Sequence, residues 1–137
     1  EKSGGSALLA DLIKTTSTTG LSKEWQVIGS LIILYLFTAL MTELLSNNAT
    51  IAIMTPVALM VAFQFGLSTS EAKAFVLTCC IAASASFITP IGYQTNTFVY
   101  TVGGYRFKDF AKFGIWPMLI YFIGTISIVG YLWSFFP

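Results

Sequence analysis

The chain has 137 residues, of which 55% are hydrophobic and 9% are charged, and its formal net charge is +1. A soluble domain carries about 25% charged residues, so this composition excludes an ordinary soluble fold and predicts an integral membrane protein. The sequence has no histidine, which excludes imidazole metal sites and histidine acid–base catalysis within the chain. With no basic run, no nucleophile–base pair and no metal cluster in view, we expect neither nucleic-acid binding nor an enzyme.

Residues 1–24 are predicted to form the end of a preceding helix and a linker. Residues 6–13 are mostly apolar, whereas residues 14–23 are rich in threonine and serine and are typical of a loop or an interfacial segment. Trp25 marks the predicted entry into the membrane, because tryptophan is enriched at the membrane–water interface.

Residues 25–66 contain two apolar arms, 27–45 and 51–66, separated by the sequence Ser-Asn-Asn-Ala-Thr at residues 46–50. At a rise of about 1.5 Å per residue the arms would be about 28 and 24 Å long, whereas a full span needs roughly 20 residues. Two full spans joined by a tight turn fit these lengths, and so does a re-entrant helical hairpin whose tip is buried in protein. Periodicity alone does not separate the two.

Residues 71–105 are predicted to form one discontinuous transmembrane helix. The stretch 74–105 carries no charge and is too long for a single ordinary span, and it is interrupted by Pro-Ile-Gly-Tyr-Gln-Thr-Asn at residues 90–96. We expect helix over 74–89, an unwound loop over 90–96 and a short helix over 97–102. Such a break is tolerated only where the backbone faces protein, water or ligand.

The last two elements are an interfacial segment and a final span. In residues 106–114 the side chains of Phe107, Phe110 and Phe113 recur every third position, with the charged residues off that stripe. This pattern favours a short amphipathic helix at the interface. Residues 115–137 are apolar with aromatic residues at both ends, which predicts the last transmembrane helix.

The two polar interruptions, 46–50 and 90–96, are the candidate functional segments. Helices that end or begin at a break leave carbonyl and N–H groups unpaired. The carbonyl oxygens suit a hard cation such as Na⁺, and the N–H groups at a helix start suit an anion. The plainer alternative is that these polar side chains bridge neighbouring helices. Glu43, the only charged residue between positions 27 and 66, is either a cation or proton ligand or a partner of a polar backbone group.

Two motifs resemble those of a known family. The pattern S-x-x-F-x-x-P-I-G-x-x-x-N-x-x-V, which runs from Ser84 to Val99, and the sequence T-E-L-L-S-N-N-A-T at residues 42–50 resemble the signatures of the divalent anion/sodium symporter family. This family comprises the sodium:sulfate and dicarboxylate symporters of the ion transporter superfamily. Phe98 stands where the family usually has an aliphatic residue.

The resemblance implies a fold. The chain would be the C-terminal inverted repeat of an elevator-type transporter, all-α and membrane-embedded. It would consist of a re-entrant hairpin with its tip at 46–50, a discontinuous helix and a final transmembrane span. The resemblance thus favours the hairpin that length alone left open. The partners implied are the lipid bilayer, an N-terminal repeat missing from this chain and a second copy in a homodimer.

The resemblance also implies a site shared by the hairpin tip and the facing loop. Beyond the coupling ion, sodium, no cofactor is expected. The residues expected to bind substrate are Ser46, Asn47, Asn48, Thr95 and Asn96. The residues expected to hold sodium are Ser46, Asn47, Thr50, Thr89, Pro90, Gly92 and Asn96.

The function implied is sodium-coupled secondary active transport of a small anion by a multi-pass protein of the plasma or inner membrane. Two departures from the family pattern, Asn48 in place of Thr and Tyr93-Gln94-Thr95 in place of Thr-Pro-Pro, touch the substrate side. They argue against dicarboxylate specificity and favour sulfate or another oxyanion, with a di- or tricarboxylate as the alternative. The coupling ion is open between sodium and the proton. The alternatives are an accessory membrane subunit that kept the fold without transport, and an arsenite-type export permease.

Overall fold

The computed structural model describes residues 4–17, 20 and 22–136, and all its regular structure in these residues is helical. The prediction of an all-α fold is therefore confirmed for the part of the chain described. The helices are α1 (Gly5–Ser17), α2 (Lys23–Thr42), α3 (Asn47–Gln64), α4 (Thr69–Ala83), α5 (Gln94–Gly103) and α6 (Phe107–Leu132). Of these, α2 and α6 are long and apolar enough to cross a membrane.

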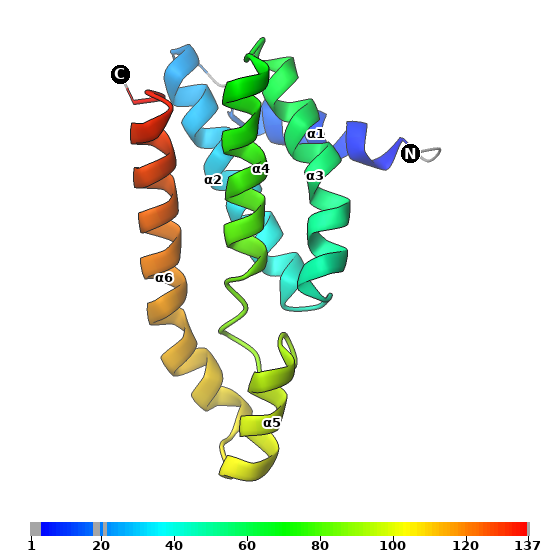
Figure 1. The fold of residues 1–137 in the computed structure, drawn as a ribbon, viewed down its shortest axis with the longest axis vertical. Helices are drawn as coiled ribbons and strands as arrows, with labels where there is room; N and C mark the ends of the chain where they lie inside the picture. The colour runs from blue at the N-terminus through cyan, green and yellow to red at the C-terminus, as the bar shows by residue number, and fades with distance from the viewer. Residues whose placement is uncertain (1–3, 18–19, 21, 137) are drawn as a thin grey trace.

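The helices α2 and α3 form an antiparallel hairpin whose turn lies partway along the length of α6 (Figure 1). Helix α4 packs against both arms of this hairpin and against α6, while α1 packs across α2 and α3. Below α4 the chain unwinds, continues into α5 at the lower end, and returns through α6 to the upper end (Figure 1). The hairpin turn and the unwound stretch thus lie at a similar depth.

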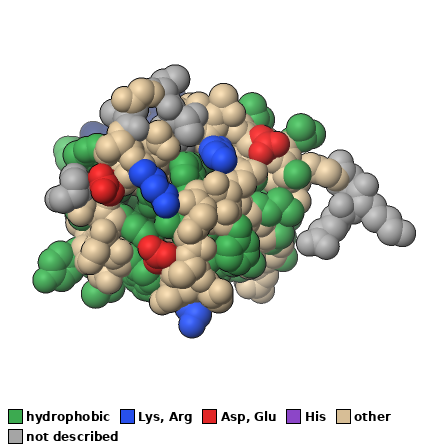
Figure 2. Space-filling model, turned by 90° about the horizontal axis from the view of Figure 1, so that it is seen from above, with side chains coloured by type: hydrophobic (Ala, Val, Ile, Leu, Met, Phe, Trp, Pro, Cys, Tyr) green, Lys and Arg blue, Asp and Glu red, His purple; other side chains and the backbone are tan. Residues whose placement is uncertain are grey.

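The upper end carries charged side chains. The starts of α2 and α4 both lie there, and the end-on view shows several lysine or arginine and acidic side chains between hydrophobic ones (Figure 2). The starting segments contain Lys23 and Glu24 in α2 and Glu71 and Lys73 in α4. Charged helix starts at one end and apolar helix bodies below fit a structure whose upper end lies at a membrane surface.

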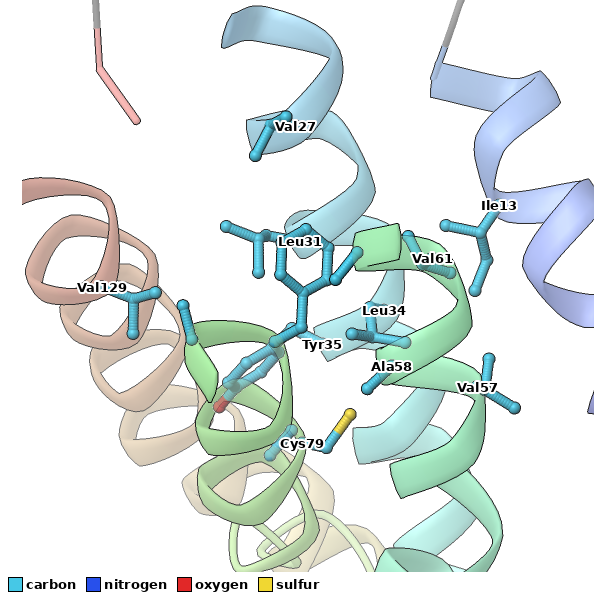
Figure 3. Close-up of a cluster of buried hydrophobic side chains, with 14 of the residues drawn as sticks. Ile13, Val27, Leu31, Leu34, Tyr35, Val57, Ala58, Val61, Cys79 and Val129 are labelled. Carbon is cyan, nitrogen blue, oxygen red and sulfur yellow. The ribbon is translucent and has the colours of Figure 1, made fainter. Parts of the chain in front are cut away.

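One apolar cluster holds α2, α3, α4 and α6 together. Tyr35 and Phe75 are the largest side chains with no exposed surface, and the ring of Tyr35 lies 5.2 Å from that of Phe122 in α6. Ala58 and Ala62 of α3 are small and fully buried, and small side chains let helix backbones pack closely. The close-up in Figure 3 labels Ile13, Val27, Leu31, Leu34, Tyr35, Val57, Ala58, Val61, Cys79 and Val129 of this cluster.

The hairpin turn is shorter and earlier than the tip predicted at 46–50. Helix α2 ends at Thr42, the turn occupies residues 43–46, and Asn47 to Thr50 already form the first turn of α3. The reason is helix capping: the Ser46 hydroxyl accepts a hydrogen bond from the Ala49 N–H at 3.2 Å, which satisfies one of the donors that a helix start leaves free.

The break in the second half begins earlier than the loop predicted at 90–96. Helix α4 ends at Ala83 and α5 begins at Gln94, so residues 84–93 are non-helical and residues 94–96 are helical. Two side chains of the first turn of α5 bond carbonyls of the loop: Asn96 those of Ser86 and Thr89, and Thr97 that of Pro90. These bonds replace the helical ones that the loop residues lack.

The remaining boundaries also differ from the predictions. Residues 106–114 and 115–137 are not separate elements, because α6 runs unbroken from Phe107 to Leu132 with Pro117 inside it. Its start is fixed by the Arg106 N–H, which donates to the Asp109 carboxylate at 2.8 Å. In the segment predicted as 1–24, helix α1 extends to Ser17. The linker residues 18, 19 and 21 lie outside the described residues.

The start of α4 provides a test of capping at the upper end. The Ser68 hydroxyl accepts from the Glu71 N–H, and the Glu71 carboxylate accepts from the Ser68 hydroxyl and N–H at 2.6 and 2.7 Å. These bonds from Ser68 hold the pKa of the Glu71 carboxyl below its ordinary value of 4.5. We therefore expect Ser68→Ala to lower the free energy of unfolding by about 1 kcal/mol in chemical denaturation.

The same pair predicts a pH dependence. Because the folded-state pKa of Glu71 is lowered, its contribution is complete above its ordinary pKa and is lost as the pH falls through the lower, folded-state value. The difference in stability between the wild type and Ser68→Ala should accordingly shrink in acid. Ser70→Ala, which removes an exposed hydroxyl two residues along, is the control. A loss of the same size for both variants, or one independent of pH, would contradict the capping assignment.

Candidate binding site between the hairpin turn and the broken helix

The hairpin turn and the loop after α4 enclose a pocket of about 460 Å³. The structure therefore brings together the two polar interruptions that the sequence singled out. The hairpin contributes Leu44, Leu45, Ser46, Asn47 and Asn48, and the opposite wall is made of Ile91, Gly92, Tyr93 and Gln94. Neither wall includes a lysine or arginine, so an anion held here would meet N–H groups and amides.

On the hairpin side, the start of α3 faces the pocket. Ser46, Asn47 and Asn48 line it, and the first N–H groups of a helix lack intrahelical partners and carry its positive dipole end. The Thr42 hydroxyl lies 2.8 Å from Asn47 Oδ1 and 2.6 Å from the Ala83 carbonyl oxygen, so its single proton can be donated either to the amide or to the end of α4. Sequence reasoning did not name Thr42 as a site residue, although it is the first residue of the motif at 42–50, because the sequence alone does not show that its hydroxyl reaches Asn47 and Ala83.

Thr50, in the first turn of α3, does not line the pocket. Its hydroxyl is fully buried and has no hydrogen-bond partner among the described residues. An oxygen that is buried without a donor is unfavourable unless something occupies it. Its place in the first turn of α3 is compatible with the predicted role as a cation ligand, which stays a prediction.

On the loop side, the predicted residues take different places. Gly92 lines the pocket, whereas Thr95 and Asn96 do not. The Asn96 amide instead donates to the Ser86 and Thr89 carbonyl oxygens at 2.9 and 3.2 Å, which supports the loop. The carbonyl of Pro90 is likewise engaged by the Thr97 hydroxyl at 2.8 Å. Asn96 therefore does not contact the pocket itself, and it affects the pocket by holding the loop that forms one wall.

Glu43 lies at the junction of the two walls. Its carboxylate accepts hydrogen bonds from the Ile88 N–H at 2.9 Å, from the Thr89 N–H at 3.0 Å and from the Thr89 hydroxyl at 2.6 Å. The sequence left open whether Glu43 binds a cation or proton or pairs with polar backbone groups. In the structure it pairs with the backbone of the loop, and Thr89 is occupied by the same contact.

A second, mostly apolar cavity of about 490 Å³ lies between α5 and α6. Its wall is formed mainly by aromatic and aliphatic side chains, among them Phe87, Val99, Phe110 and Phe113. Asn96 also lines this cavity. It lacks the cluster of oxygen and N–H groups found at the hairpin turn. The chemistry suited to an ion and an anion is therefore concentrated in the first pocket.

The arrangement of a capped hairpin turn facing an unwound helix break, in a chain with two helices able to cross a membrane, is typical of membrane transporters. Comparison with known proteins identifies the group. The family described as "Sodium:sulfate symporter transmembrane region" matches residues 1–136, and the chain belongs to this family. It is accordingly part of an integral membrane protein of a transporter family rather than an enzyme family.

Individual relatives agree with this membership. The chain is 48% identical over 107 residues to an uncharacterized transporter of Synechocystis sp., a match that covers 78% of this chain and 17% of the relative. It is 37% identical over 96 residues to sodium/sulfate cotransporter 1 of Chlamydomonas reinhardtii, covering 67% and 11%. It is 31% identical over 100 residues to solute carrier family 13 member 2 of Mus musculus, covering 73% and 16%. The chain spans less than a fifth of the length of these relatives. No solved structure matches it.

The site depends on a close approach between the loop and α6, which a substitution can test. A Cβ atom on Gly114 of α6 would overlap the Phe87 carbonyl oxygen of the loop, whereas one on Gly124 of the same helix would meet nothing within 4 Å. We expect Gly114→Ala to lower the thermal stability of the purified protein, because the loop must move away. Gly124→Ala should be neutral or slightly stabilising, since alanine is the better helix former. Equal effects of the two changes would argue against this packing.

Proposed function

We propose that the chain is one repeat of a secondary active transporter that carries a small anion together with Na⁺. The observation that carries the proposal is the pocket between the hairpin turn and the loop, where the start of α3 faces the backbone of the helix break. The N–H groups at the helix start favour an anion. The hydroxyl, amide and carbonyl oxygens of Ser46, Asn47, Thr50 and Gly92 are the ligand type that a hard cation prefers.

Sulfate or a related oxyanion is the substrate we favour over a di- or tricarboxylate. Relatives whose names include sodium/sulfate cotransport are 37–40% identical to the chain. The pocket wall around Asn48 and Tyr93 to Gln94 is also where the sequence departs from the dicarboxylate pattern. A compact tetrahedral anion can be held by N–H and amide donors without a cationic side chain.

The proposal includes the way the site moves. We take the α2–α3 hairpin as re-entrant, because its turn lies partway along α6 (Figure 1). A site of this kind would cross the bilayer with its supporting helices, in the elevator manner, against a scaffold formed by other parts of the protein. An N-terminal repeat, a second copy and a plasma or inner membrane location belong to the same proposal. The rivals are an accessory subunit without transport and an arsenite-type permease.

Uptake into proteoliposomes tests the function. The full-length gene product is reconstituted into proteoliposomes. Uptake of radiolabelled sulfate and of radiolabelled succinate is then measured with a Na⁺ gradient, with a proton gradient and with neither. Sulfate accumulation driven by Na⁺ is the expected result. Succinate accumulation alone would overturn the substrate class, and proton-driven uptake would overturn the coupling ion. An absence of accumulation under every gradient would favour the accessory subunit.

Asparagine substitutions test the site. We expect Asn47→Ala and Asn96→Ala to abolish Na⁺-coupled uptake while the protein remains folded by size-exclusion chromatography. Asn47→Ala removes a pocket donor and acceptor directly, whereas Asn96→Ala frees two loop carbonyls. Gln64→Ala removes a side-chain amide at the far end of α3, where it contacts Asp11, and should retain uptake. Normal Na⁺-dependent uptake in both asparagine variants would rule out the assigned site.

A further inference from the structure

We infer that Glu43 is a positioning residue that fastens the loop of residues 84–93 to the hairpin turn, so that the two walls of the pocket move as one body. The fastening itself is a property of the structure, and only its effect on transport rests on the proposed function. The inference starts from the surroundings of the carboxylate. It is 7% exposed, and Glu43 caps the end of α2 as the first residue of the turn.

The donors that surround this carboxylate all come from the loop. Ile88 donates its N–H to one oxygen, and Thr89 donates its N–H and its hydroxyl to the other. The segments that supply the contact, residues 27–66 and 74–105, contain no lysine or arginine. A buried charge must be paired or well hydrogen-bonded to be tolerated. Here the loop backbone takes the place of a basic partner, so the loop is held by charge-assisted hydrogen bonds.

A short relay carries this contact to the pocket wall. The Gly92 N–H donates to the Thr89 hydroxyl at 3.0 Å, and that hydroxyl donates to Glu43. Gly92 is itself a lining residue of the pocket. A Cβ atom at position 92 would overlap the Ser86 hydroxyl and lie 2.6 Å from Glu43 Oε2. The glycine therefore sits directly against the carboxylate, and its place in the wall is set by Glu43.

The same geometry argues against a role of Glu43 as a cation ligand. Both carboxylate oxygens already accept hydrogen bonds from the loop, one from Ile88 and the other from Thr89. One oxygen already accepts two of the three bonds, which leaves little room for a cation on that side. Positioning is the role that uses every contact observed.

Hydrogen exchange tests the fastening without reference to transport. In the full-length protein in detergent or nanodiscs, Glu43→Gln replaces an acceptor oxygen by an NH₂ group that opposes the loop donors. We expect amides in the peptide covering residues 85–93 to exchange at least about tenfold faster, the effect of losing hydrogen bonds to a charged group. Peptides from the middle of α3 and α4 should be unchanged. Thr125→Val, which removes a hydroxyl bonded only within α6, is the control and should exchange like the wild type.

A second pair of variants keeps the test decisive if Glu43→Gln does not fold. Thr89→Val removes the hydroxyl from the relay and should raise exchange in the same peptide, whereas Thr89→Ser retains the hydroxyl and should restore protection. Unchanged exchange in Glu43→Gln, or in Thr89→Val where the first variant is unfolded, would overturn the inference. Equal exchange in the valine and serine variants would overturn the relay to Gly92.

The transport readout separates positioning from direct ion binding. If Glu43 positions the loop, Glu43→Gln should raise the half-saturating sulfate concentration by about tenfold in parallel with the faster exchange. Loss of uptake with unchanged exchange would show that Glu43 acts on the ion itself and would overturn the positioning role. Faster exchange in a protein whose wild type takes up neither sulfate nor succinate would support the fastening while the proposed function fails.

Discussion

The constraint on which this structure depends is that a backbone inside a bilayer has no water to bond. Each helix break at membrane depth exposes N–H and carbonyl groups that must find partners within the protein. Two helix breaks among the described residues, at 43–46 and 84–93, show how such groups find partners. Side chains supply several of them: Ser46 caps α3, Glu43 accepts from the loop N–H groups, and Asn96 and Thr97 donate to the loop carbonyls.

This mutual satisfaction explains why the two breaks lie together. An unwound segment alone would be costly, since a buried polar group without a partner costs about 1–3 kcal/mol. The hairpin turn supplies a carboxylate acceptor, and the loop supplies the donors that the carboxylate requires. The apolar cluster between α2, α3 and α4 (Figure 3) holds the two breaks at the same depth. A pocket lined by polar groups then arises where the two segments meet.

Sequence reasoning predicted which segments matter better than it predicted their boundaries. The all-helical class, the hairpin and the interrupted helix could be read from apolar runs broken by Asn, Ser, Pro and Gly. The boundaries were displaced because capping acts at single residues: Ser46 draws Asn47 to Thr50 into α3, and Asn96 allows α5 to start at Gln94. The contacts of Thr42 and Thr97, and the choice among the roles of Glu43, depend on pairs that are five or more residues apart, some of them on different helices. A single sequence carries no signal for such pairs.

The residues that frame the loop are not the residues that line the pocket. Hydrogen bonds from four residues fix the shape of the loop: Glu43, Thr89, Asn96 and Thr97. The side chains of Ile91, Tyr93 and Gln94 line the pocket and take part in none of these bonds. The lining is therefore free to vary in size and polarity while the backbone behind it stays in place. In a scaffold divided in this way, exchange of these three exposed side chains would change the surface of the pocket without removing any of the hydrogen bonds that hold the helix break.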